Sequence, residues 1–173
     1  MKYLLGLVAL LAGLAVGNGF PDIDQKTGLL LHRSIVTHGP LVPIFVFVAA
    51  SGTRSIQLRW FALGVTLGVA VHFSFDLFPN GWSGFALISV PSYGWTAPSF
   101  SWTWIAISTV ACTYLALRLV RSGLDRSLFM LALICTFGYI AVGEDAFWRP
   151  IGALTIATII SLTPAVRRAI SSD

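Results

Sequence analysis

Six side chains with oxygen or nitrogen ligand atoms fall into three short motifs in the first half of the chain. They are Asp22, Asp24, His32, His38, His72 and Asp76. A set of this kind without cysteine suits a divalent cation, zinc as the first candidate, with manganese or iron taking the same ligand types. A catalytic zinc ion takes three or four protein ligands, so six exceed the need of one ion and could serve two. The sequence therefore predicts a centre of one or two divalent ions.

The spacing within each motif decides how its side chains could converge. His72 and Asp76 stand four residues apart, so on a helix they share one face and both can point at one ion. The two aspartates follow Pro21, where carboxylates can also act as helix caps or turn formers. The two histidines at 32 and 38 are six apart, which does not fit one face of a helix and requires a loop or a helix start. A histidine within a membrane span can also simply hydrogen-bond a neighbouring helix, so a structural alternative stays open.

Two further residues could act on a substrate beside the metal. Arg33 lies between the two histidines and offers a bidentate donor for a phosphate group. Glu144 and its neighbour Asp145 lie between two apolar runs, and Glu144 is the predicted general base or additional ligand. The alternative for this pair is a solvated turn. Ser34, Thr37 and Asn80 are candidate hydrogen-bond partners of the ligands.

The elements that must position these residues are membrane helices. The chain has 173 residues, 56% of them hydrophobic and only 10% charged, against about a quarter charged in soluble domains. Apolar runs predict helices at about 3–19, 39–52, 58–78, 102–119, 127–142 and 150–166. The second run is short, since 14 residues reach only about 21 Å. We expect an all-α, polytopic membrane helix bundle of about six transmembrane helices, forming a single integral membrane domain over residues 1–173.

The first apolar run has the length and the leading Lys2 of a signal peptide. No A-x-A cleavage site follows it, and the Pro21-Asp22-Ile23-Asp24 motif begins at once. We therefore expect this run to be retained as the first helix.

The positive-inside rule predicts which side of the membrane carries the motifs. With a cytoplasmic N-terminus and C-terminus, eight lysines and arginines lie inside and three outside; the three are Lys26, Arg33 and Arg149. This orientation, derived without the histidines, places all three of them outside, together with five of the seven acidic residues. The clustering of ligand-type residues on one side predicts a site there.

Two other features limit the choice of function. The basic residues are scattered singly at the ends of apolar runs, so we expect no nucleic acid partner. Cys112 and Cys135 lie inside apolar runs without CxxC spacing, so they predict neither a disulfide framework nor a thiolate site. Residues 79–101 carry no charge but several aromatic side chains, which is typical of a loop resting in the membrane interface and could also be a lid for a lipid-like substrate.

The three motifs in order resemble a known family. Pro21-Asp22-Ile23-Asp24, then His32-Arg33 with Thr37-His38, then His72 and Asp76 followed by a Pro/Gly-rich aromatic loop are similar to the YdjM-like family of inner-membrane metal-dependent hydrolases, also described as LexA-regulated. The matching residues run from about 21 to 91. The resemblance implies a helical fold distantly similar to zinc-dependent phospholipase C and P1 nuclease, with the motif histidines and aspartates as metal ligands. It also implies a bacterial inner membrane, with the site facing the periplasm.

These observations favour a membrane-embedded, metal-dependent hydrolase acting on an ester. We expect a phosphoester of a lipid or lipid-linked substrate, with membrane lipids as partners, and Arg33 holding the anionic group. One alternative is a metal-ion or proton transporter, which requires polar residues continuing across the membrane. Between Leu63 and Val71 only Thr66 is polar, which disfavours it. The other alternative is a non-catalytic membrane scaffold.

Overall fold

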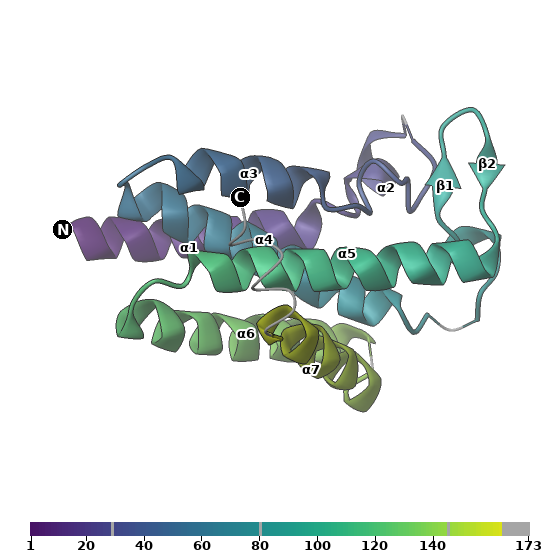
Figure 1. Cartoon of the computed structure of the whole chain (residues 1–173). Coiled ribbons are helices and arrows are strands. Elements are labelled where there is room, and N and C mark those ends of the chain that lie inside the picture. Colours follow the sequence, from purple (N-terminus) through teal and green to yellow (C-terminus); the bar gives the residue numbers. More distant parts are fainter. Residues whose placement is uncertain (29, 80, 145, 164–173) are drawn as a thin grey trace.

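The computed structural model of the chain describes residues 1–28, 30–79, 81–144 and 146–163, which fold mainly into helices (Figure 1). Helices in the described part are α1 (Lys2–Gly19), α2 (Ile23–Thr27), α3 (Leu41–Ser51), α4 (Ile56–Asp76), α5 (Pro98–Leu119), α6 (Gly123–Glu144) and α7 (Trp148–Leu162). Between α4 and α5 lie the 3-10 helix η1 (Gly84–Ala86) and a hairpin of two short strands, β1 (Ser89–Val90) and β2 (Gly94–Trp95). The prediction of a helical fold is confirmed, and the hairpin was not foreseen.

Four helices, α1, α4, α5 and α6, are long and apolar enough to cross a membrane, with 18 to 22 residues each. The apolar helices α3 and α7 are shorter, with 11 and 15 residues. At 1.5 Å per residue they reach only about 17 Å and 23 Å, against a hydrocarbon core of about 30 Å. Each of the six predicted apolar runs contains a helix in the described part of the chain, but length alone supports four crossings.

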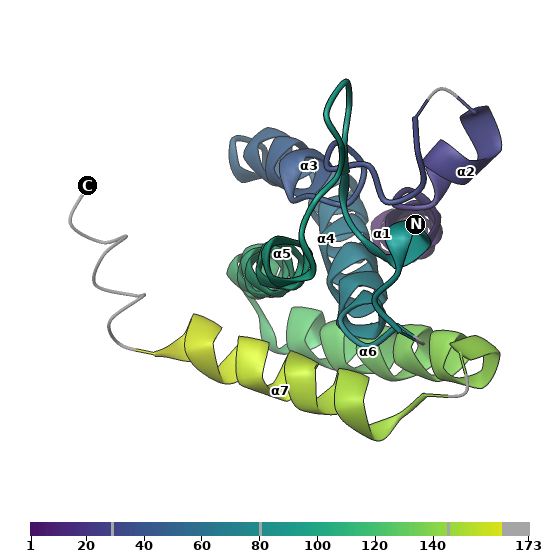
Figure 2. The same ribbon diagram turned by 90° about the vertical axis from the view of Figure 1, so that its right-hand side faces the viewer.

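Helix α4 is the central element of the bundle. Figure 2 shows it enclosed by α1, α3, α5 and α6. Residues 62–71 of α4 are all buried, as expected for a helix that is apolar on every side. The motif residues His72 and Asp76 lie in its last two turns, so the most enclosed helix fixes this pair.

The first helix packs tightly against α4. A Cβ atom on Gly13 would lie 2.2 Å from the backbone oxygen of Phe61, and one on Gly64 would lie 2.3 Å from that of Leu10. Small residues on both helices allow the two backbones to approach this closely, as in membrane helix pairs. Helix α1 is therefore an integral part of the bundle, and its end at Gly19 delivers the Asp22 motif to the end of α4.

The last helix is arranged differently from α1 and α5. In the view that shows α1 and α5 end-on, α7 is seen lengthwise (Figure 2), so it runs obliquely to them. The sequence predicted a helix over 150–166 with the same role as the other spans. The described helix ends at Leu162, and residues 164–166 of that prediction lie outside the described residues.

The hairpin between α4 and α5 is hydrogen-bonded to the segment between His32 and His38. Ser89 pairs with Trp95 in the hairpin and forms a parallel bridge with Ser34. The Ile35 amide donates to the Ser89 carbonyl at 2.8 Å, and the Ser89 amide donates to the Arg33 carbonyl at 2.9 Å. The aromatic loop thus braces the backbone of the segment that carries the two histidines.

Candidate metal centre

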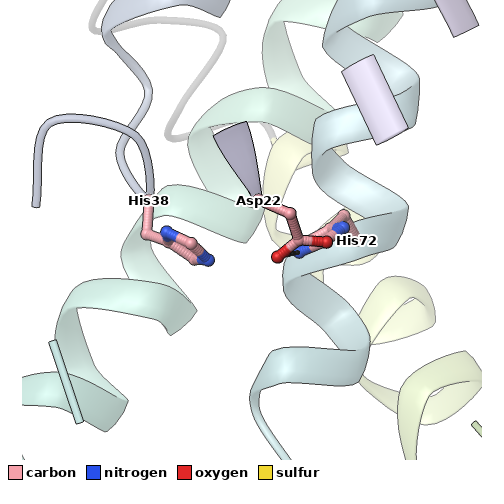
Figure 3. A group of neighbouring side chains, drawn as sticks. All are labelled: Asp22, His38 and His72. Atoms are coloured by element: carbon pink, nitrogen blue, oxygen red, sulfur yellow. Dashed lines mark ion pairs between the residues drawn. The ribbon is translucent and has the colours of Figure 1, made fainter. Parts of the chain in front are cut away.

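Three segments bring one ligand-type side chain each to the same point, as Figure 3 shows. Asp22 stands just before α2, His38 lies in the turn before α3, and His72 lies near the end of α4. One ligand atom from each residue lies within 4.8 Å of those of the other two. The three motifs therefore converge, and Asp22, His38 and His72 form a candidate metal-binding triad.

Asp76 adjoins the triad from one turn further along α4. Its Oδ2 lies 3.3 Å from Nε2 of His72 and 3.5 Å from Nε2 of His38, and Nε2 of His72 lies 3.8 Å from Oδ1 of Asp22. Ligands about 2.0–2.1 Å from a tetrahedral zinc ion stand roughly 3.3 Å apart. These three separations are therefore close to those between the ligands of a metal site.

Two buried polar atoms in this group lack a hydrogen-bond partner among the described residues. They are Nε2 of His38 and Oδ2 of Asp76. A buried polar atom without a partner costs about 1–3 kcal/mol, so native proteins rarely leave one unsatisfied. A divalent cation between these atoms would satisfy both at once. The residues present therefore fit a metal ion.

The hydrogen bonds around His38 leave its Nε2 free for a ligand bond. The Thr37 hydroxyl donates to Oδ2 of Asp24 at 2.8 Å, and Nδ1 of His38 lies 3.1 Å from the same hydroxyl oxygen. Because that hydroxyl proton is directed to Asp24, Nδ1 is the donor to Thr37, and Nε2 carries the lone pair. Metal-binding histidines are commonly oriented in this way by a partner on the opposite nitrogen.

Asp24 fixes the orientation of His38 and Thr37. Its side chain is fully buried, its Oδ2 accepts from the Ser34 amide at 3.0 Å, and Nδ1 of His38 lies 3.6 Å away. Burial alone would raise the pKa of Asp24, but its contact with His38 and the hydrogen bonds from Ser34 and Thr37 together hold that pKa well below its ordinary value. Asp24 thus stays ionised and orients His38 from the side away from the triad.

His32 also lies outside the triad. Its Nδ1 is 3.5 Å from Oδ1 of Asp24, and its Nε2 is 3.3 Å from Nε2 of Gln25. The Gln25 amide in turn donates to Oδ1 of Asp22 at 3.2 Å. Gln25 therefore links Asp22 to His32. Nothing in the sequence indicated this role for Gln25.

Arg33 makes two contacts within the protein that its predicted role did not include. Its Nη2 donates to Oδ1 of Asp76 at 2.6 Å, and its Nη1 donates to the carbonyl of Ala86 at 2.8 Å. Its backbone is left-handed, with φ of 55°, which is uncommon for a residue with a side chain. The guanidinium thus orients the Asp76 carboxylate and holds η1 in place through Ala86. Arg33 also lines a neighbouring cavity.

A cavity of about 530 Å³ opens beside the candidate triad, between the ends of α4 and α6 and the start of α7. Its polar wall consists of Arg33, His72, Asp76, Glu144 and Arg149. Its apolar wall consists of Phe75, Phe78, Pro79, Ile140, Ala146, Phe147, Trp148 and Pro150. Glu144 is therefore brought to the same cavity as two of the predicted ligands, whereas Asp145 and Asn80 lie outside the described residues.

Sequence reasoning missed Trp104 of α5. Its indole N–H donates to the backbone carbonyl of His38 at 2.6 Å, so α5 fixes the backbone of this ligand. A tryptophan in an apolar span carries no sequence signal for such a role.

We predict that Asp24→Asn weakens metal binding without removing a ligand. The amide cannot match the charge that orients His38, and loss of such a partner typically costs about 10–100-fold in metal affinity. Zinc titration against a chromophoric chelator would measure this. Asp125→Asn is the matched control. It changes a buried carboxylate of α6 that contacts the start of α4, at the end of the bundle away from the triad, and it should leave zinc affinity unchanged. An Asp24→Asn affinity equal to that of the wild type would show that Asp24 has no part in the site.

Comparison of the chain with protein-family models, with curated proteins and with solved structures finds no match. The class of protein therefore follows from fold and site alone: a helical protein with four potential membrane-spanning helices and a candidate metal-binding triad at one end.

Proposed function

We propose that the chain is a membrane-embedded, metal-dependent hydrolase that cleaves a phosphoester of a lipid or lipid-like substrate. The observation that carries this proposal is the position of the triad. Asp22, His38 and His72 converge beside a cavity with one polar and one aromatic wall. The motif resemblance to YdjM-like hydrolases supports the same reaction class.

The chain's own residues have separable roles in this proposal. Asp22, His38, His72 and Asp76 would hold a divalent cation, zinc in the first instance, which when bound supplies Lewis acidity and activates water. Glu144 is an exposed carboxylate on the same cavity, where it can accept or return a proton. A second ion would also need Asp24 and His32 as ligands. Asp24 instead contacts His38, and His32 contacts Asp24 and Gln25, so we propose one ion.

We propose that Arg149, and not Arg33, contacts the anionic group of the substrate. The guanidinium of Arg33 already donates to Asp76 and to the Ala86 carbonyl. Arg149 lines the same cavity with an exposed side chain, which leaves it accessible to a ligand. A guanidinium is well suited to phosphate because it presents a planar pair of donors.

The apolar wall of the cavity favours a substrate with hydrocarbon chains. Phe147 and Trp148 line it and are 46% and 80% exposed. Tyr139 and Val142 on the neighbouring face of α6 are 78% and 88% exposed. In a bilayer these surfaces would face lipid, so an amphiphile could enter sideways and place its headgroup against the polar wall.

The membrane topology belongs to the same proposal. We infer a cytoplasmic N-terminus, with the metal centre on the outer surface of a bacterial inner membrane, because the basic residues gather at the opposite end. Six crossings require the short helices α3 and α7 to sit in locally thinned bilayer or to be extended by flanking residues. The C-terminal residues 164–173 lie outside the described part of the chain.

A transport function finds less support. Between Ala62 and Val71 the α4 side chains are buried and apolar except Thr66, whose hydroxyl donates to the Ala62 carbonyl of its own helix at 2.8 Å. A conduction path for ions needs polar groups that continue across the membrane. A scaffold without catalysis is distinguished from the hydrolase by experiment.

Phosphate release from lipid phosphates tests the proposed function. Purified full-length protein, loaded in turn with Zn²⁺, Mn²⁺ and Fe²⁺, would be assayed with phosphatidic acid, a lipid pyrophosphate and water-soluble p-nitrophenyl phosphate. We expect turnover of an amphiphilic substrate that exceeds that of the soluble one and disappears in His72→Ala. Metal binding without turnover of any of these esters would count against the hydrolase and favour the scaffold.

We predict that Arg149→Gln raises KM for an anionic lipid substrate more than it lowers kcat. Loss of a charge-assisted hydrogen bond costs about 1.5–3 kcal/mol, which is roughly 10–100-fold in kcat/KM. Arg118→Gln makes the same charge change at the other end of the bundle and serves as control. Equal effects of the two substitutions would remove Arg149 from the substrate site.

A further inference from the structure

A second cavity lies at the end of the bundle opposite the metal centre. Its volume is about 380 Å³, and it forms where the start of α1 meets the α3–α4 and α5–α6 connections, at the left of Figure 1. Its charged lining consists of Lys2, Arg54, Arg59 and Arg121. The other lining residues are Thr53, Ser55, Ile56 and Gln57. Among the described residues, no carboxylate lines this cavity.

One of the four cations is fixed by a buried carboxylate behind the cavity. Nη2 of Arg59 donates to Asp125 at 3.1 Å, and Asp125 also accepts from the Trp60 indole at 2.8 Å. The amides of Arg121 and Ser122 donate to the other Asp125 oxygen at 2.9 Å each. Asp125 thus anchors both Arg59 and the backbone of Arg121. Its single negative charge offsets one of the four positive charges and leaves the lining with a net charge of three positive units.

Further groups at this cavity favour an anion. Nε of Arg59 is buried and has no hydrogen-bond partner in the described part of the chain. Helix α4 begins at Ile56, and its first turn adds partial positive charge to that of the side chains. Three segments that are distant in sequence therefore gather positive charge around one hollow. A phosphate group would relieve the repulsion between these cations.

The surroundings favour a lipid as the source of that phosphate. Tyr3 and Leu4, next to Lys2 at the start of α1, are 52% and 66% exposed, so an apolar surface adjoins the basic cavity. The ends of helices that cross a membrane lie at the depth of the headgroups. We propose that this cavity binds the headgroup phosphate of an anionic phospholipid. The inference is independent of the hydrolase site.

Lipid selectivity of the full-length protein tests this inference. Binding of phosphatidylglycerol and of phosphatidylcholine to detergent-purified protein would be measured by native mass spectrometry. We expect a preference for phosphatidylglycerol that falls about thirtyfold in the Arg54→Gln/Arg121→Gln double variant, the effect of two cations near an anionic surface. Both side chains are exposed, so their replacement should leave the fold intact, and thermal unfolding would verify this.

The matched control is Arg118→Gln/Arg126→Gln, which removes the same charge at the same end from exposed residues outside the cavity lining. This control should change the preference less than about threefold, because it removes charge without removing a contact. Equal losses in both double variants, or no preference in the wild type, would overturn the proposal. Glycerol 3-phosphate should compete at least about tenfold less well than the lipid, since it lacks acyl chains. Equal competition would assign the cavity to a soluble phosphate instead.

Discussion

Replacing His38 by alanine is expected to reduce zinc affinity by about a hundredfold or more. Zinc-binding free energies of about 10–16 kcal/mol, divided among four ligands, give roughly 3 kcal/mol for each. His38 is fully buried, its Nδ1 is held by Thr37 and its Nε2 points at Asp76 without a hydrogen-bond partner among the described residues. No other described histidine is placed to substitute for it. Isothermal titration of the purified variant with Zn²⁺ would measure the loss.

The matched control comes from the same segment. His32→Ala removes an imidazole that contacts Asp24 and Gln25 and lies outside the triad. We expect its zinc affinity to fall less than about tenfold, the lower limit for loss of a group behind a ligand. If His32→Ala were as damaging as His38→Ala, both histidines would be ligands, and the two-ion centre suggested by the sequence would replace the one-ion site.

The second large effect is expected at the interface of α1 and α4. Gly64→Ala would place a Cβ 2.3 Å from the backbone oxygen of Leu10, and neither helix backbone can yield at such a contact without separating from the other. Overpacking a tight interior costs about 1–3 kcal/mol, and a backbone clash belongs at the upper end of that range. Because α1 delivers Asp22 to the triad, zinc affinity should fall along with stability.

Gly138→Ala is the control for this substitution. Gly138 lies on an exposed face of α6, where a Cβ would meet nothing within 4 Å. In a helix interior alanine is favoured over glycine by up to about 1 kcal/mol, so this variant should match or exceed the wild type in thermal stability. Equal stability of Gly64→Ala and the wild type would mean that α1 is not packed on α4 as described.

The sequence predicted the helices and the convergence of the motifs for clear physical reasons. Long apolar runs can satisfy their backbone polar groups only as helices inside a membrane. The spacing of His72 and Asp76 fixes a common face whatever the rest of the fold. The charge asymmetry then grouped the three motifs at one end, and in the structure all six predicted ligand residues lie in one connected cluster.

The sequence could not predict which residues of that cluster are candidate ligands and which orient the ligands. Asp22 and Asp24 are equivalent in the sequence, but only the structure shows Asp24 turned toward the Ser34 amide and the Thr37 hydroxyl. These contacts join residues ten or more apart through irregular backbone. The bonds of Arg33 to Asp76 and Ala86 span 43 and 53 residues, and periodicity carries no information about such pairings. The hairpin that braces the second motif is too short to leave a strand pattern.

The metal content of the purified protein provides the most direct test of the proposed site. Full-length protein purified in detergent would be reconstituted with Zn²⁺, analysed by elemental mass spectrometry and examined by X-ray absorption at the zinc edge. We predict about one zinc per chain, coordinated by two imidazole nitrogens and by carboxylate oxygen, at bond lengths of about 2.0–2.2 Å. This zinc should be lost in His72→Ala. Protein that retains no zinc, or zinc bound through sulfur of the two cysteines, would contradict the assignment of Asp22, His38 and His72 as a metal site.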